Sequence, residues 1–306
     1  MRIHQLGRLS VLSILLASCF TTQAANAADT LLLRQPTVSR DHLAFVYAGD
    51  IWLADRDGQH PMRLTTHPAS EFAPKFSPDG KWLTFSASYD NNTDVYVIPV
   101  QGGEARRLTW HPGQDVVVGW SADGKRVLFS SNREIANSRS NQLYEVPLEG
   151  GYEKKVMEAI AFEGNWSGDG KLLAYRPFRQ AYSGTSGWRQ HRGGTTPPVW
   201  IMDVANNKLE KIPHENANDS NPVWVGDEVF FISDRKDGAA NLFAYNRQNK
   251  TVRQVTTETV WDVRNLGAYG TTVVYEVGGA LKELDTVSGK TQSIHVDLES
   301  DGRAHV

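Results

Sequence analysis

Cysteine is almost absent from this chain of 306 residues, since Cys19 is the only one. A single cysteine excludes an intrachain disulfide and a zinc site built from several thiolates. The chain also lacks a large excess of positive or negative charge, because it has 32 Lys and Arg residues and 35 Asp and Glu residues. The net charge of −3 gives no support to a nucleic-acid partner or to binding at an acidic membrane surface.

Catalytic motifs are missing as well. Neither H-E-x-x-H nor G-x-G-x-x-G nor a Walker phosphate loop occurs. Residues 184–187 (Gly-Thr-Ser-Gly) lack the second spaced glycine of a nucleophile elbow. The polar loop 90–94 lacks the glycine and distal glutamate of an EF loop, which favours a solvated turn over a calcium site. We therefore assign no catalytic, cofactor-binding or metal-ligating residue, and expect no cofactor.

The N-terminus carries the one notable apolar run, residues 9–20, which is too short to span a bilayer comfortably. It follows Arg2 and Arg8 and precedes an A-x-A site at residues 25–27, so residues 1–27 are predicted to be a signal peptide. An alternative is a lipobox at residues 16–19, which would leave Cys19 lipidated. Both readings predict export from a bacterial cytoplasm, to the periplasm or to a lipid anchor on Cys19, which would be the only membrane contact.

A repeated phrase decides the fold class. Phe-Ser-Pro-Asp-Gly-Lys at residues 76–81 returns as Trp-Ser-Ala-Asp-Gly-Lys at 120–125 and as Trp-Ser-Gly-Asp-Gly-Lys at 166–171. Each copy leads into an apolar, β-prone run. The Asp-Gly pair suits a tight turn with positive φ, and the preceding aromatic residues are expected to pack between neighbouring sheets. A period of 40 to 50 residues is typical of a propeller or solenoid.

A second series of apolar segments, beginning with residues 50–53 and 94–97, recurs six times in the same phase. With its flanking strands and turns, each unit holds four strands, which is a propeller blade. The predicted blades are 37–66, 70–109, 114–156, 160–212, 217–256 and 260–295. We predict an all-β, six-bladed β-propeller over residues 28–296, with almost no helix. Residues 31–34 are expected to pair with the last blade and close the ring, and 297–306 to link to a downstream region.

The repeated phrase resembles the blades of TolB-like and WD40-like propellers. Two stretches narrow the resemblance. One is residues 131–134 followed by 141–151, and the other is the insert 187–195 (Gly-Trp-Arg-Gln-His-Arg-Gly-Gly-Thr) that leads into the strand at 199–201. Both resemble the first propeller of tricorn-type proteases of the S41 class, and the resemblance covers nearly all of the chain after the signal peptide. It implies a module of a large, hexameric serine peptidase that trims peptides. The catalytic core of that family has no counterpart here, so no catalytic residue is carried over.

The insert in the fourth blade is the sequence's best candidate for a contact site. Residues 176–198 form a loop about twice the expected length, rich in arginine, and insertions in repeats map to one face. We predict that Trp188, Arg189, His191 and Arg192 contact either a peptide or another part of the assembly. The alternative is local packing against a neighbouring blade, domain or subunit. His67 and His111 recur at the repeat phase and are interpreted as blade-connection residues.

Two functions remain open at this point. The first is a non-catalytic propeller module of an exported tricorn-like serine peptidase, which shapes peptide access and egress and docks other domains or subunits. The second is a stand-alone exported TolB-like scaffold with a protein partner. The expected partners are accordingly peptides, downstream domains of the same protein, or copies of this chain.

Overall fold

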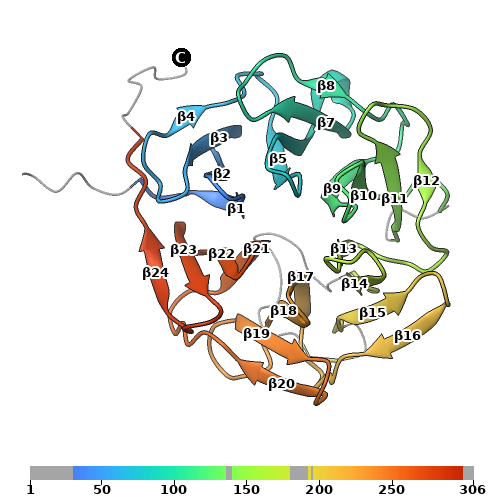
Figure 1. Cartoon of the computed structure of the whole chain (residues 1–306), viewed down its shortest axis with the longest axis vertical. Helices are drawn as coiled ribbons and strands as arrows, with labels where there is room; N and C mark the ends of the chain where they lie inside the picture. The colour runs from blue at the N-terminus through green and yellow to red at the C-terminus, as the bar shows by residue number, and fades with distance from the viewer. Residues whose placement is uncertain (1–29, 136–139, 180–191, 194–195, 299–306) are drawn as a thin grey trace, which may run out of the picture.

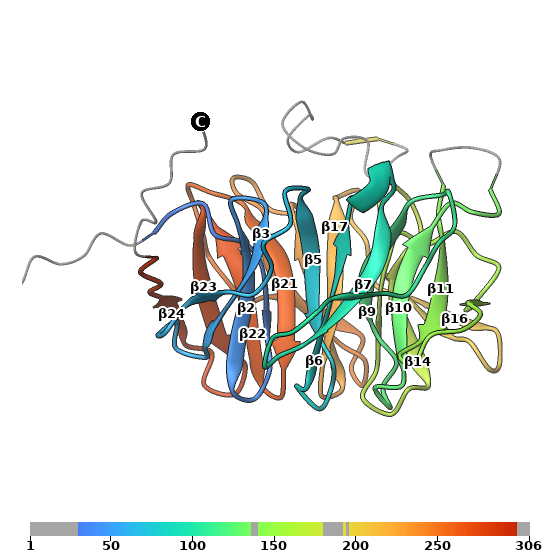
Figure 2. The same ribbon diagram turned by 90° about the horizontal axis from the view of Figure 1, so that it is seen from above.

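The computed structural model describes residues 30–135, 140–179, 192–193 and 196–298. Its strands form six four-stranded antiparallel sheets, each built from four consecutive strands, arranged as blades around a central axis (Figure 1). Figure 2 shows that the strands run from one face of this disc to the other. The predicted six-bladed β-propeller is therefore confirmed.

Each blade runs from an innermost strand beside the axis to an outer edge strand. In the first three blades the strands are β1 (Arg34–Val38), β2 (His42–Tyr47), β3 (Asp50–Asp55), β4 (Met62–Arg63), β5 (Glu71–Phe76), β6 (Trp82–Ala87), β7 (Asp94–Pro99), β8 (Arg106–Arg107), β9 (Asp115–Trp120), β10 (Arg126–Ser131), β11 (Gln142–Pro147) and β12 (Lys154–Lys155). In the last three they are β13 (Glu163–Trp166), β14 (Leu172–Arg176), β15 (Trp200–Asp203), β16 (Lys208–Lys211), β17 (Asp219–Val225), β18 (Glu228–Ser233), β19 (Asn241–Asn246), β20 (Thr251–Gln254), β21 (Val263–Tyr269), β22 (Thr272–Val277), β23 (Ala280–Asp285) and β24 (Thr291–Ile294). Over the described residues, helix is confined to one 3-10 turn, η1 (Tyr89–Asn91), and none is long and apolar enough to cross a membrane.

The Asp-Gly turns form as predicted. In the second blade the Ser77 hydroxyl donates to Asp79 Oδ1 over 2.6 Å, and the same oxygen accepts from the backbone N–H of Lys81. Gly80 takes a φ of +71°, which favours glycine. The blades at Asp123 and Asp169 repeat the two bonds to the carboxylate. This shared geometry explains why the phrase recurs along the chain.

The geometry of two successive blade connections also matches the sequence interpretation. The ring nitrogen Nδ1 of His67 accepts from the backbone N–H of Ala69 over 3.0 Å, and Nδ1 of His111 accepts from that of Gly113 over 2.9 Å. Both histidines therefore stabilise equivalent turns between blades.

Ring closure differs from the prediction. Residues 31–34 do not add a strand to the last sheet, which consists of β21 to β24 alone, and Arg34 instead begins β1. The N-terminal segment bonds to the last blade outside its sheet, through Leu33 N–H to Gly279 O and Thr30 N–H to Val296 O. A core shared between the first and last blades, which includes Leu33, holds the seam. Apolar packing and these two backbone hydrogen bonds, rather than an added strand, thus close the ring.

Candidate functional site

The predicted insert site is described at one of its four residues. Trp188, Arg189 and His191 lie outside the described residues. Arg192 donates from Nη1 to Asp234 Oδ2 over 3.0 Å and from Nη2 to the Asp234 carbonyl over 2.7 Å. Asp234 also accepts from the backbone and side chain of Asn218, so Arg192 is joined to the fifth blade. The contact role of the four residues together stays a prediction.

Arg176, which the sequence placed at the start of the insert, belongs to the wall of the central channel. It lies at the end of β14, with its Nη2 2.9 Å from Glu163 Oε1 and its Nη1 donating to the Phe178 carbonyl over 2.9 Å. The guanidinium also lies over the Phe162 ring, 5.4 Å from the centroid. Its charge is therefore compensated within the fourth blade.

The central channel is a cavity along the axis of the ring of blades. It has a volume of about 670 Å³ and is lined by all six innermost strands. Aromatic side chains line part of it, while among the described lining residues only Lys75, Glu163 and Arg176 carry charge. Two of the aromatics also fulfil the predicted packing role: Trp120 Nε1 donates to the Lys75 carbonyl in the second blade, and Trp166 Nε1 to Glu145 in the third.

Four of the innermost strands carry a bulge with a left-handed residue other than glycine. These residues are Gln35 (φ +50°), Ala73 (+54°), Asn221 (+49°) and Asn265 (+48°). At three bulges the freed N–H bonds to a neighbouring blade: Gln35 to Glu276, Ala73 to the Gln35 amide oxygen, and Asn221 to Glu163. Such strained positions cluster at functional sites and re-aim the side chains beside them.

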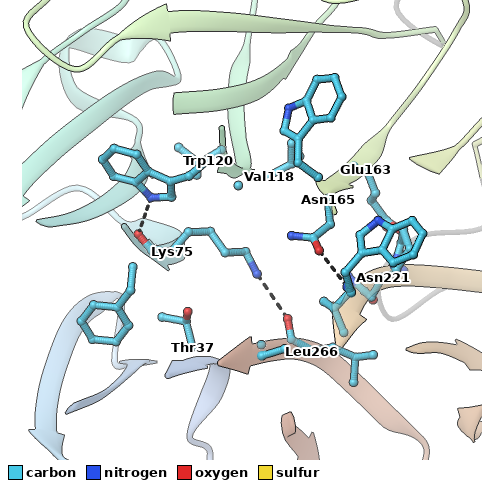
Figure 3. A pocket seen from close by; sticks show the side chains of 18 of the residues that line it. Thr37, Lys75, Val118, Trp120, Glu163, Asn165, Asn221 and Leu266 are labelled. Atoms are coloured by element: carbon cyan, nitrogen blue, oxygen red, sulfur yellow. Dashed lines mark hydrogen bonds between the residues drawn. The ribbon is translucent and has the colours of Figure 1, made fainter. Parts of the chain in front are cut away.

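Lys75 follows one of these bulges and extends across the channel. Its Nζ passes the first blade and donates to the Leu266 carbonyl of the sixth over 3.3 Å (Figure 3). That carbonyl belongs to another bulge, where the β21–β22 register skips two residues. Burial lowers the pKa of Lys75 to about 8, and the negative charge of Glu163 partly opposes the effect.

The register explains why Lys75 is exceptional. Its equivalents around the ring, at the same position of each innermost strand, are Thr37, Gly119, Asn165, Val223 and Gly267. None of these is charged. Thr37 of the first blade and Gly267 of the last are small, which leaves room for the lysine side chain. Sequence reasoning missed Lys75 because the residue directly precedes the repeated turn phrase. The sequence did contain one signal: Lys75 is the only charged residue among the six equivalent positions of the innermost strands.

The burial of Lys75 predicts a dependence of stability on pH. The folded chain releases the lysine proton near pH 8, whereas the unfolded chain holds it to about pH 10.5. Between these values the unfolded state binds more protons, so the free energy of unfolding should rise with pH. Relative to Lys75→Met, we expect wild type to gain up to about 3 kcal/mol between pH 8 and 10.5 in urea unfolding. A constant difference between the two proteins across that range would contradict the buried position.

The described lining residues offer hydrogen-bond donors and acceptors beside apolar surface. Among the described ones there is no histidine or cysteine, and Ser130 accepts a hydrogen bond from the Asn141 amide over 2.8 Å. A serine nucleophile needs a hydrogen bond to an adjacent base, and for Ser130 the described residues show none. Nor does the described part contain a group of three or more His, Cys, Asp or Glu residues that would hold a metal ion.

These features define a six-bladed propeller with a central channel of mixed polar and apolar lining. Comparisons with known proteins identify its family. The family model for the tricorn protease N-terminal beta propeller domain matches residues 30–290. The chain therefore belongs to this family of propeller domains.

Individual relatives agree with the family. Tricorn protease homolog 1 of Streptomyces coelicolor is 31% identical over 259 residues, which is 84% of this chain and 24% of that protein. The tricorn protease homolog of Saccharolobus solfataricus is 25% identical, over 87% of this chain and 24% of that protein. The chain thus spans about a quarter of the length of these relatives.

Solved structures show the same fold. The crystal structure of the tricorn protease superposes with a TM-score of 0.77 at 24% identity, over 88% of this chain and 27% of that one. TolB from Acinetobacter baumannii gives a TM-score of 0.63 at 15% identity, over 87% of this chain and 63% of that one. The TolB-like architecture expected from the repeated phrase is confirmed.

Proposed function

We propose that this chain is the non-catalytic propeller module of an exported, tricorn-like serine peptidase of the S41 class. Its channel would form a path for peptides, and its faces would dock the catalytic domains or further subunits, in a ring such as the family's hexamer. The observation that carries the proposal is the family match over residues 30–290, combined with a central channel about 670 Å³ in volume. The described lining residues offer contacts to a peptide, and no histidine or cysteine is among them.

The test separates the module from its peptidase. The chain alone should leave fluorogenic peptides intact, and should bind the polypeptide encoded directly downstream of Val306, which should carry the peptidase activity. Co-purification and peptide cleavage measure the two properties. Hydrolysis by the chain alone would contradict the proposal. A downstream region without a peptidase core would favour the stand-alone TolB-like scaffold.

We also propose that the protein acts outside the cytoplasm, in the periplasm or anchored through a lipid on Cys19. The support is the charged, apolar and small-residue order of residues 1–27. Cell fractionation with wild type and Cys19→Ser distinguishes the two: only a lipoprotein would leave the membrane fraction on substitution, and cytoplasmic retention of both would contradict export.

A further inference from the structure

We propose that the central channel holds a specific site for a peptide carboxylate, with Lys75 Nζ as the counter-ion and the amide groups of Asn165 and Gln35 as further donors. This inference rests on the proposed function, because it names the chemical group that the channel would recognise on a passing peptide.

Lys75 supplies a charge that the described residues leave uncompensated. Its ammonium group has three N–H donors, and one of them bonds to the Leu266 carbonyl. It forms no ion pair in the described part of the chain. The only carboxylate among the described lining residues, Glu163, already accepts from Arg176 and from the backbone of Asn221. The channel wall therefore carries one net positive charge, centred on Lys75.

The neighbouring amides are oriented so that their donors remain unused. Asn165 Oδ1 accepts from the backbone N–H of Trp224 over 2.8 Å, and Gln35 Oε1 accepts from that of Ala73 over 2.7 Å. Both oxygens are thus occupied, while Asn165 Nδ2 and Gln35 Nε2 have no partner among the described residues. Figure 3 shows the Asn165 amide nitrogen on the channel side of its strand. A ligand here must accept hydrogen bonds.

The charge and the donors together favour a carboxylate. A single ammonium with flanking N–H groups matches one negative charge on two oxygens, whereas a phosphate dianion is normally held by several cations or an arginine fork. The wall is partly aromatic, with Trp120, Trp166 and Trp224 among the lining residues. A partly apolar wall strengthens the attraction between opposite charges relative to bulk water. Either a peptide C-terminus or an Asp or Glu side chain would present this group.

Three acetylated tripeptides test the site by calorimetry with the full chain at pH 7. Ac-Gln-Gln-Gln carries a terminal carboxylate, amidated Ac-Gln-Glu-Gln carries a side-chain carboxylate, and amidated Ac-Gln-Gln-Gln carries none. We expect at least one acidic peptide to bind at least about tenfold more tightly than the neutral one, which is the range of a charge-assisted hydrogen bond. The preferred acidic peptide identifies the source of the carboxylate. Binding should weaken above pH 8 as Lys75 loses its proton.

Two variants keep the test sharp. Lys75→Met should abolish the preference for a carboxylate, while Lys81→Met, an exposed lysine of the same blade that pairs with Asp79, should preserve it. Asn165→Asp retains an oxygen for the Trp224 N–H but replaces the free donor with a negative charge, so it too should weaken binding at least about tenfold.

Equal binding of all three peptides, unchanged binding by Lys75→Met, or tighter binding of inorganic phosphate would each overturn the carboxylate site. Association with the downstream peptidase is measured separately. If that association holds while the peptides fail to bind, the carboxylate inference is wrong and the module function stands.

Discussion

Replacing Arg235 with alanine should lower the free energy of unfolding by about 3–5 kcal/mol, the range for breaking a buried ion pair. Arg235 Nη2 lies 3.0 Å from Asp219 Oδ2, and the two side chains are 4% and 0% exposed. The Ser233 hydroxyl accepts from both the backbone N–H and Nε of Arg235. Phe231 and Phe243 lie 5.2 Å from the guanidinium carbon. The substitution leaves the Asp219 carboxylate buried without its arginine partner and removes the guanidinium that lies over the two stacked rings.

Arg253→Ala is the matched control in the same blade. Arg253 pairs with Glu228 at 2.6 Å, but its side chain is 50% exposed, so this variant should lose at most about 1 kcal/mol. Urea unfolding of the three proteins gives the comparison. If the Arg235 variant lost no more than the Arg253 variant, the buried pair would not be a determinant of stability.

The same arrangement recurs in the third blade and explains part of the sequence signal. Arg133 lies 2.7 Å from Asp115, bonds to Ser131, and lies 5.0 Å from the rings of Phe129 and Tyr144. Residues 131–133 belonged to the stretch that indicated the tricorn-type family. In the structure these residues join β9 and β10 of the third blade through Asp115 and Ser131. The resemblance in this stretch therefore reflects the fold of the blade.

The blades were predictable because their signals are local. A turn such as that of Asp79 and Gly80 is specified by residues within five positions, and the Ser77 hydroxyl completes it. The six predicted units consequently enclose nearly all the observed strands, and Arg34–Val38 begins only three residues before the predicted start of the first unit. Local propensity, turn chemistry and period all agreed on the same fold.

The channel site was not predictable because its parts come from distant blades. Lys75 meets the Leu266 carbonyl across 191 positions of sequence, and Asn165 meets the Trp224 backbone across 59. The left-handed conformations beside these groups occur at Gln35 and Ala73. Glutamine and alanine rarely adopt a positive φ, so the sequence gives no sign of them. The prediction for residues 31–34 was right about the partner, because the segment contacts the last blade, and wrong about an added strand. Strand propensity does not specify which sheet a segment joins.

The seam between the last and first blades yields the second large effect. Gly267→Ala should destabilise the propeller by about 2–3 kcal/mol, the range for overpacking a dense interface. A Cβ at Gly267 would lie 2.8 Å from both the Pro36 carbonyl oxygen and the Thr37 Cα. Both atoms belong to the backbone of β1, which cannot move aside as a side-chain end would. The first and last blades would have to separate where apolar packing closes the ring.

Gly119→Ala tests the same substitution at the equivalent register position of the third blade. A Cβ there would meet the Gly164 carbonyl oxygen at 3.6 Å, an ordinary contact, so its stability should change by less than about 0.5 kcal/mol or rise slightly. Thermal and urea unfolding compare the two variants. Amide hydrogen exchange locates the damage, since Gly267→Ala should speed exchange in β1 and β22 before β9 and β10. Equal destabilisation by both alanines, or uniform exchange around the ring, would show that the seam is no tighter than any other blade interface.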